Sequence, residues 1–348
     1  MFARLRRTIA ACLVIAATTS LAPAAEPYRP DPKLVEEARK EGQALWYTTL
    51  IVEQIVRPLI RLFQAQVPGI DIRFVRIDSS QQVVRLMNEA RAGRVQADVW
   101  SVIDGAAPLA QSGVAGQFDI ASAKDLPASL VDPNRRWIAT NLATRSLAYN
   151  TSLVKQDQAP RNYQDLLNPR WKRSLVWNPN SMTGAWGFIA TVLRHMGEDS
   201  GMAYLRALAK QEIVPLPIAT RAVLDRVIAG EYLIGLEMVN AHAATSLALG
   251  APVKWVALDA VTTTLQVAGV TANAPHPNAG RLFLDFITSR AGQDAFRQAN
   301  YIPMHPDIPA KDPTMKAEQG GYKSIVLSPE DVDTFAQRYQ KIYQDIFR

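Results

Sequence analysis

The sequence predicts an α/β protein with a mainly parallel sheet. Apolar, strand-like runs alternate with amphipathic helical segments over most of the 348 residues. The segments between these runs are long enough to be helical crossovers, which parallel neighbours require. Several of the runs end in Ser or Thr directly before a helix is expected. The length suggests two domains, and the sequence contains neither an internal repeat nor a low-complexity segment.

The chain begins with the features of a secretory signal peptide. Three arginines within residues 4–7 precede an apolar run over 8–21, and the segment APAA follows at 22–25. The run is shorter than the roughly 20 residues of a spanning helix, which argues against the alternative of a membrane anchor. We therefore expect export to the periplasm, with cleavage after Ala24 or Ala25. Both Sec and twin-arginine export remain open.

Cysteine usage and charge narrow the classes of function. Cys12 is the only cysteine, and it lies within the expected signal peptide. The mature chain therefore has no thiol to form a disulfide, act as a nucleophile or bind a metal. Loss of three arginines with the signal lowers the formal net charge from +6 to +3. Because no Lys/Arg cluster runs along one segment, we expect no nucleic-acid partner.

Six elements are expected in the first third of the mature chain. They are a helix at 34–40, a strand at 44–49, a helix ending at 66, a strand at 70–77, a helix from Asp78 to Gly93, and a strand at 97–103. Gly42 ends the first helix, and Pro58 predicts a kink or a late start in the second. The fourth element alternates apolar and charged residues, which is the period of a strand. Asp78 stands where a helix cap is expected.

The remaining elements continue the alternation. They are strands at 146–149, 174–177, 232–238 and 265–270, and helices at 163–167, 185–193, 220–229, 278–288 and 329–347. Gly230 ends one helix and leads into the strand at 232–238. The periodicity of the helix at 278–288 turns Leu282, Phe283 and Phe286 inward. We expect the residues that follow Val239 to form the polar end of a buried strand.

Hydroxyl side chains recur where a strand gives way to a helix. The residues concerned are Thr48, Thr49, Ser79, Ser80, Ser181, Thr183 and Thr220. Helix N-termini carry unpaired N–H groups, and ligands of open α/β sheets bind beyond the carboxyl ends of the strands. Each residue on its own is explained as a helix cap. Four such sites in two halves of the chain favour a ligand cleft between lobes, with Gly184 and Ala185 at one of the helix starts.

A series of motifs resembles a known family. In order, they are YTT, IDIRFV, ADVWSVIDG, ATRSLAYN, YQDLLNPRWKRS, GEYLIGL and APHPNAGRLFLDFITSRAGQ. Their order and spacing over most of 30–305 resemble the periplasmic solute-binding proteins of ABC importers, in the iron(III)-type branch of type 2 periplasmic binding proteins. The resemblance implies two α/β lobes that close on a ligand. It divides the chain into a signal peptide (1–25), a first lobe (26–138 and 266–320), a second lobe (139–265) and a helical tail (321–348).

The resemblance also identifies one departure from the family. In ferric-iron members, the strand after Gly-Glu ends in two adjacent tyrosines that bind the metal, and the positions here hold Asn240 and Ala241. Neither side chain supplies the charged oxygen that ferric iron favours. We therefore expect no resident metal and no cofactor, and we expect the cleft to admit a ligand larger than an ion. Ferric iron or a ferric chelate stays open as an alternative.

Two arginines indicate the chemistry of the ligand. By the same alignment, Arg221 opens a helix at the cleft, and Arg145 lies on the strand that enters the second lobe. Guanidinium groups bind carboxylates and phosphates, so we expect a small organic anion of carboxylate or phosphonate type. An ordinary ion pair is the alternative for either arginine. Asp104, which closes the motif ADVWSVID, and Asn240 complete the expected ligand-binding residues.

An enzymatic function is not supported by the motifs. The sequence contains no Gly-x-Ser-x-Gly and no His-Glu-x-x-His, and its four histidines are scattered. We therefore expect a non-enzymatic, monomeric binding protein whose partner is the membrane permease of an ABC importer. A ligand-sensing partner of a membrane receptor has the same fold and remains open.

Overall fold

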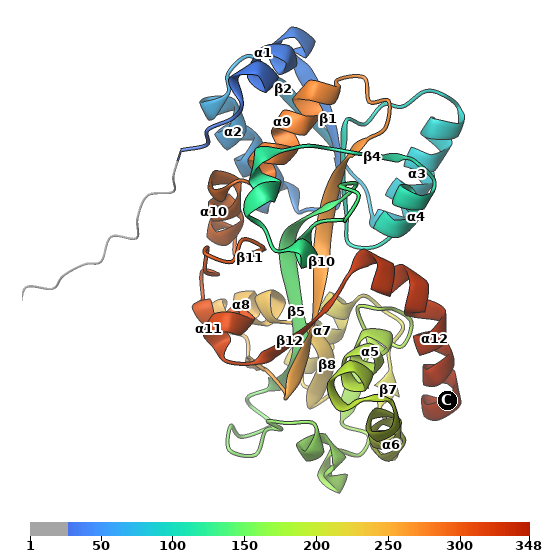
Figure 1. Cartoon of the computed structure of the whole chain (residues 1–348). Helices are drawn as coiled ribbons and strands as arrows, with labels where there is room; N and C mark the ends of the chain where they lie inside the picture. Colours follow the sequence, from blue (N-terminus) through green and yellow to red (C-terminus); the bar gives the residue numbers. More distant parts are fainter. Residues whose placement is uncertain (1–26) are drawn as a thin grey trace, which may run out of the picture.

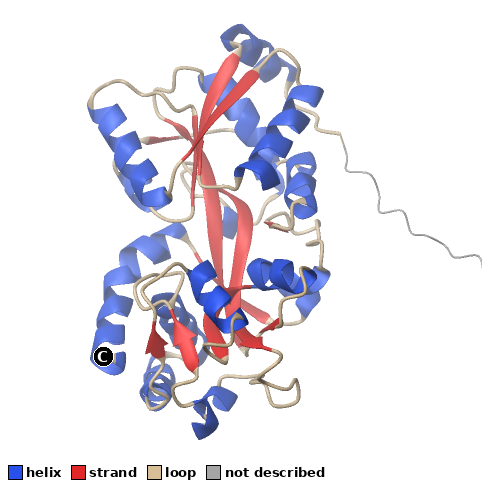
Figure 2. Cartoon of the chain, turned by 180° about the vertical axis from the view of Figure 1, so that it is seen from behind, coloured by secondary structure: helices blue, strands red, loops and turns tan. Residues whose placement is uncertain are grey.

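Two long antiparallel strands connect the two lobes of the molecule. The computed structural model describes residues 27–348, so the expected signal peptide and its cleavage site lie outside the described residues. The connecting strands are β5 (Ile138–Asn150) and β10 (Ala260–Thr271), and they run through the middle of the molecule (Figure 1). The main path of the sheet has the order β2-β1-β3-β10-β5-β8-β6-β7. Helices lie on both sides of the strands in each lobe (Figure 2).

The first lobe forms around β1 and its parallel neighbours. Its strands are β1 (Gln43–Thr48), β2 (Asp71–Arg76), β3 (Val99–Val102) and β4 (Ala115–Gly116), and its helices are α1 (Pro32–Glu41), α2 (Arg57–Gln66), α3 (Ser79–Arg91), α4 (Ala106–Gln111), α9 (Pro277–Thr288) and α10 (Arg290–Gln298). Its core is rich in aromatic side chains. The Phe283 ring lies 5.3 Å from those of Trp46 and Phe63, with both pairs packed edge to face. The inward face expected for the helix at 278–288 is confirmed, because Leu282, Phe283 and Phe286 are all buried.

The second lobe has its own core around Trp177 and Phe188. Its strands are β6 (Leu175–Trp177), β7 (Val214–Pro215), β8 (Ile234–Val239) and β9 (Val253–Val256), and its helices are α5 (Ala185–Met196), α6 (Glu198–Ala209), α7 (Thr220–Ile228) and α8 (Asn240–Ala248). The chain then ends with β11 (Ile302–Pro303), α11 (Ala317–Gly320), β12 (Lys323–Leu327) and α12 (Pro329–Phe347).

The C-terminal helix α12 belongs to the second lobe but also contacts the first. Val332, Tyr339 and Tyr343 pack into the second-lobe core. Near its start, Trp137 of the first lobe donates a hydrogen bond to Glu330, 2.9 Å long. The helix expected at 329–347 is confirmed, and it begins with a complete capping box formed by Ser328 and Asp331.

The connecting strands are longer than the sequence predicts. Strands were expected at 146–149 and 265–270, whereas β5 and β10 have 13 and 12 residues. Their extra residues include Thr140, Asn141 and Thr144, which are polar and yet buried. Polar side chains hide a strand from periodicity, and only neighbouring strands on both edges bury them here. The domain boundaries expected at 138, 265 and 320 remain a prediction.

Several helices differ from the expectation. The late start expected near Pro58 is confirmed, because a π-helical turn over Val52–Val56 precedes α2. The expectation of a polar strand end after Val239 is wrong, because Asn240–Ala248 forms helix α8. Alanine favours helices, and its abundance in this segment supplied a local signal that we did not use. Helices α4, α6 and α10 were also not predicted.

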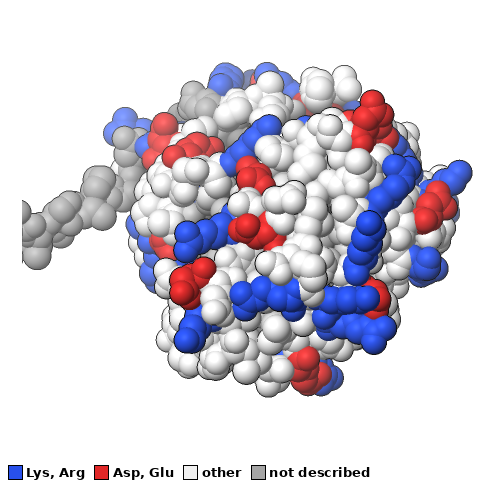
Figure 3. Space-filling model, turned by 90° about the horizontal axis from the view of Figure 1, so that it is seen from below, with Lys and Arg blue, Asp and Glu red and all other residues white. Residues whose placement is uncertain are grey.

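Charges of both signs occur together on the lower face of the molecule. Seen from below, Lys and Arg side chains lie beside Asp and Glu side chains (Figure 3). Such pairing recurs in the structure, where Lys172 and Arg173 contact Glu212 at 2.7 and 2.5 Å. Over residues 27–348, no helix is long and apolar enough to cross a bilayer.

Candidate functional site

The predicted hydroxyls of the first lobe lie at or just after the carboxyl ends of β1 and β2, but most of them already form hydrogen bonds. Ser101 donates a hydrogen bond to Thr48, 2.9 Å long, and both side chains are fully buried. Gln266 of β10 donates to the Thr49 hydroxyl at 2.7 Å. The Ser79 hydroxyl accepts from the backbone N–H of Ile103 at 3.1 Å. These bonds hold the strand ends of the first lobe together and link them to the connecting strand β10.

Two predicted residues of the first lobe lie apart from this group. Ser80 lines a separate surface hollow of about 600 Å³ together with Arg85 and Glu89. The charge of Asp104 raises the pKa of Asp333 on α12, after the larger effect of burial. Asp104 therefore lies near the C-terminal helix.

The predicted residues around the start of α5 do come together with the start of α7. The hydroxyls of Ser181 and Thr183 are 3.1 Å apart, and Thr220 donates to the Thr183 carbonyl at 3.2 Å. A side chain is not tolerated at Gly184, because a Cβ there would lie 2.3 Å from the Asn178 carbonyl oxygen. Ala185 follows as the first, buried residue of α5.

The capping alternative is wrong for these helices. Helices α3, α5 and α7 have no side-chain hydrogen bond at their N-caps, which are Asp78, Gly184 and Ala219. The hydroxyls instead bond to one another and to backbone groups of neighbouring strands and loops. Between the described residues, no hydrogen bond joins Thr48 or Ser79 to Thr183 or Thr220, so closure of the two groups on a ligand remains a prediction.

The two predicted arginines lie in different environments. Arg221 forms an ion pair with Asp225 one turn along α7, at 3.0 Å, and its side chain is 46% exposed. Arg145 is only 5% exposed. Its guanidinium donates to the Ala143 carbonyl and the Thr264 hydroxyl. Its Nε has no hydrogen-bond partner, and among the described residues no carboxylate oxygen lies within 4.0 Å of its nitrogens.

Glu237 is the acidic group whose charge acts on Arg145. It is buried at a bulge between β5 and β8, with a left-handed φ of 60°. Its Oε1 accepts from Thr262 at 3.0 Å, and its Oε2 has no partner among the described residues. Burial raises the pKa of Glu237 to about 8, against the opposing effect of Arg145. Burial lowers the pKa of Arg145 to about 10.

Within residues 27–348 Arg145 has no carboxylate in contact, and burial shifts Glu237 toward its neutral form, so the positive charge of Arg145 is incompletely compensated. Nearby His242 does not add a second charge, because burial and then the charges of Arg145 and Arg221 lower its pKa to about 4. The carboxyl end of β8 is therefore electropositive and desolvated, which favours an anion.

Asn240 does not face an open cleft with a free amide. Its Nδ2 donates to the Met315 carbonyl at 2.9 Å, and its Oδ1 accepts from Ala241 N–H at 2.7 Å. The segment around Met315 thus covers the first turn of α8.

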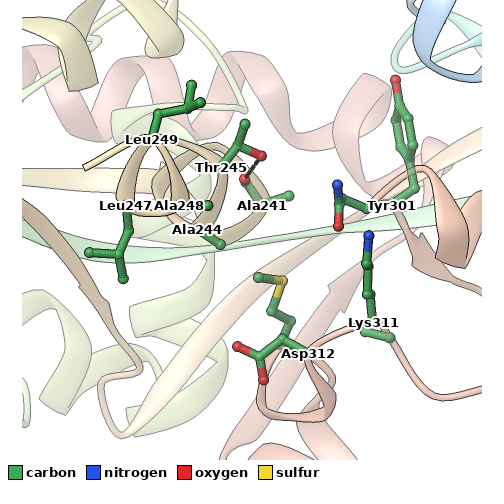
Figure 4. A pocket seen from close by; sticks show the side chains of 12 residues that line it. Ala241, Ala244, Thr245, Leu247, Ala248, Leu249, Tyr301, Lys311 and Asp312 are labelled. Atoms are coloured by element: carbon green, nitrogen blue, oxygen red, sulfur yellow. Dashed lines mark hydrogen bonds between the residues drawn. The ribbon is translucent and has the colours of Figure 1, made fainter. Parts of the chain in front are cut away.

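A pocket of about 450 Å³ lies beside this turn, between the lobes. From the second lobe, the face of α8 that begins at Ala241 lines it, and from the first lobe Asn300 and Tyr301 do so. Lys311, Asp312 and Met315 complete it from the C-terminal segment (Figure 4). The expectation that the position of Ala241 borders space larger than an ion is consistent with this volume.

The first-lobe and tail residues of this pocket were missed by sequence reasoning. Asn300, Tyr301 and Lys311 follow α10 in irregular segments, and no local pattern marks them as neighbours of α8. As for metals, the described residues contain no group of three or more His, Cys, Asp or Glu side chains that could hold an ion. The phenols of Tyr47 and Tyr149, which lie within two of the sequence motifs, are both buried.

Comparisons with known proteins agree with this architecture. The model of a family described as bacterial extracellular solute-binding protein matches residues 106–320. A substrate-binding protein of an ABC transporter from Agrobacterium tumefaciens superposes with a TM-score of 0.71 at 19% identity, covering 88% of this chain and 94% of that chain. A Trichodesmium protein in complex with iron and citrate gives 0.71 at 18%, covering 88% and 99%. The Actinobacillus pleuropneumoniae protein AfuA, with fructose-6-phosphate bound, gives 0.68 at 19%, covering 88% and 98%.

At these identities the superpositions show the fold. They confirm the expected two-lobed fold of type 2 periplasmic binding proteins. The resemblance inferred from the motif series is confirmed by the family match.

Proposed function

The chain belongs to the bacterial extracellular solute-binding proteins, and we propose that it is the solute-binding component of an ABC importer. We further propose that its solute is a small organic anion bound between the lobes. Its partner is then a membrane permease that receives the solute. The Agrobacterium neighbour is itself described as the substrate-binding protein of an ABC transporter, which supports the importer role.

The incompletely compensated charge of Arg145 carries the proposal of an anion. A buried guanidinium without a carboxylate partner is unfavourable unless another group neutralises it. An anion above the start of α8 supplies that neutralisation in a site where Coulomb interactions are strong. Arg221, the other arginine expected to bind the ligand, takes a secondary role because Asp225 already neutralises it.

The ligands of two neighbours are compatible with this chemistry. One protein is described with iron and citrate, and another with fructose-6-phosphate, so an anionic organic group occurs in both complexes. Several other neighbours are described as ferric-binding proteins. A ferric chelate is therefore included among the ligands to be tested with this chain.

The anion is tested by isothermal titration of the purified mature protein. The probes are citrate, phenylacetate, fructose 6-phosphate, a phosphonate, ferric citrate and spermidine. A charge-assisted contact contributes roughly 1.5–3 kcal/mol, so Arg145→Met should weaken binding of the best anion by about one to two decades. Arg206→Met removes an exposed arginine of α6 and should leave the affinity unchanged.

Three results would contradict the proposal. Binding of spermidine alone would show a cation site. Unchanged anion affinity in Arg145→Met would show that Arg145 does not hold the anion. Binding of ferric iron without an organic anion, with visible absorbance from phenolate-to-iron charge transfer, would favour the metal alternative. Separately, solute uptake that survives deletion of the gene intact would contradict the importer role and leave a sensing role.

A further inference from the structure

We propose that the solute is an amphipathic carboxylate, with an aromatic or branched aliphatic body that lies along α8. This inference rests on the proposed function, since it names the class of anion that the same site accepts. It depends on the composition of the interlobe pocket and on the register of Arg145, which pairs with Val239 directly before α8.

One wall of the pocket, the carbon wall, consists of apolar side chains. Ala241, Ala244 and Ala248 share one face of α8, and Leu247 and Leu249 flank them (Figure 4). Met315 and Ala310 add apolar groups from the C-terminal segment. These side chains offer a ligand no hydrogen-bond donor, and the only acceptor among them is the weak thioether sulfur of Met315.

The Thr245 hydroxyl on this wall already donates a hydrogen bond. Thr245 donates to the Ala241 carbonyl at 2.8 Å, as the dashed line in Figure 4 shows. Its proton therefore satisfies the helix backbone and is not offered to the pocket. A polyhydroxylated or multiply charged solute placed here would lose water without gaining protein hydrogen bonds on this side.

The same wall is partly exposed to solvent. Leu247 is 54% exposed and Leu249 is 84% exposed, which is high for leucine. Burial of such surface by an apolar group is favourable in proportion to the area removed from water. The pocket volume of about 450 Å³ lies within the range of small-molecule sites.

The polar side of the pocket and the charge of Arg145 determine the orientation of the proposed ligand. Val239, whose register partner is Arg145, is the residue immediately before α8. The acidic group should therefore lie at the N-terminal end of α8, where the charge of Arg145 and the helix dipole both favour it. The body then extends toward Ala248. Asn300, Lys311 and Asp312 line the opposite side, where they tolerate polar atoms on the body.

The test compares anions that differ in their apolar part. Acetate, phenylacetate, citrate and fructose 6-phosphate are titrated separately into the mature protein. We expect phenylacetate to bind at least tenfold more tightly than acetate and than either hydrophilic anion. Ala244→Asp places a carboxylate on the carbon wall and should abolish phenylacetate binding. Ala203→Asp, the same change at an exposed position of α6 outside the pocket, should leave the affinity within twofold. Circular dichroism checks that both variants are folded.

The outcomes separate this inference from the proposed function. Tight binding of citrate or fructose 6-phosphate, with no preference for phenylacetate, would overturn the amphipathic class while the anion anchor stands. Unchanged phenylacetate affinity in Ala244→Asp would also overturn it, because the body would then lie elsewhere. Absence of binding by all four anions, with response to spermidine alone, would refute the proposed function itself.

Discussion

Removal of the Glu330 carboxylate should measurably destabilise the protein through its contact between the lobes. Glu330 lies in the first turn of α12 and accepts the indole N–H of Trp137 at 2.9 Å. Trp137 is only 2% exposed. In Glu330→Ala the indole nitrogen therefore loses its partner where water reaches it poorly.

The magnitude follows from two contributions. A hydrogen bond to a charged group contributes roughly 1.5–3 kcal/mol. A carboxylate in the first turn of a helix adds roughly 0.3–1 kcal/mol through the helix dipole. Glu330→Ala should therefore lower the free energy of unfolding by about 2–4 kcal/mol. Glu330→Gln keeps a carbonyl acceptor for the indole and should lose only about 1 kcal/mol.

Urea denaturation followed by circular dichroism at 222 nm measures the effect. The midpoint of Glu330→Ala should fall clearly below that of Glu330→Gln, at an unchanged slope. Asp345→Ala, at the exposed end of the same helix, serves as the matched control and should lie within about 0.5 kcal/mol of the parent. Equal midpoints for the Ala and Gln variants would refute the reasoning, because the acceptor would then contribute nothing.

Three further predictions concern stability. Burial raises the pKa of Glu237 to about 8. The stability that the Glu237 side chain contributes is therefore complete below pH 4.5 and is lost as the pH rises through about 8. The melting temperature of Glu237→Gln should lack this decline, and a parallel decline in both proteins would contradict the prediction. Gly187→Ala places a Cβ 2.2 Å from the Met182 carbonyl oxygen and should cost about 1–3 kcal/mol in urea denaturation, whereas an unchanged midpoint would show that the loop gives way. Phe283→Ala removes a fully buried ring from the first-lobe core and should cost about 3–5 kcal/mol; a cost below 1 kcal/mol in the same assay would show that the core refills the cavity.

Elements with strong local signals were predictable from the sequence. The C-terminal helix was located correctly from its amphipathic pattern, and the capping box of Ser328 and Asp331 at its start also lies within one turn. The α/β class followed from alternation alone, since each strand and helix has its own period of apolar residues. The family followed from the order of short motifs. The absence of a tyrosine pair at Asn240 and Ala241 also needed only the sequence.

The roles of the site residues depended on partners far away in the chain. Arg145 and Arg221 look alike in sequence, but Arg221 meets Asp225 four residues on, whereas Arg145 meets Thr264 across the sheet. Which arginine keeps an incompletely neutralised charge is therefore decided by strand register. The same holds for Tyr301 and Lys311, which face α8 only because the chain returns between the lobes. Burial and electrostatics are properties of the packed chain, and local periodicity carries no information about which distant segment supplies the partner.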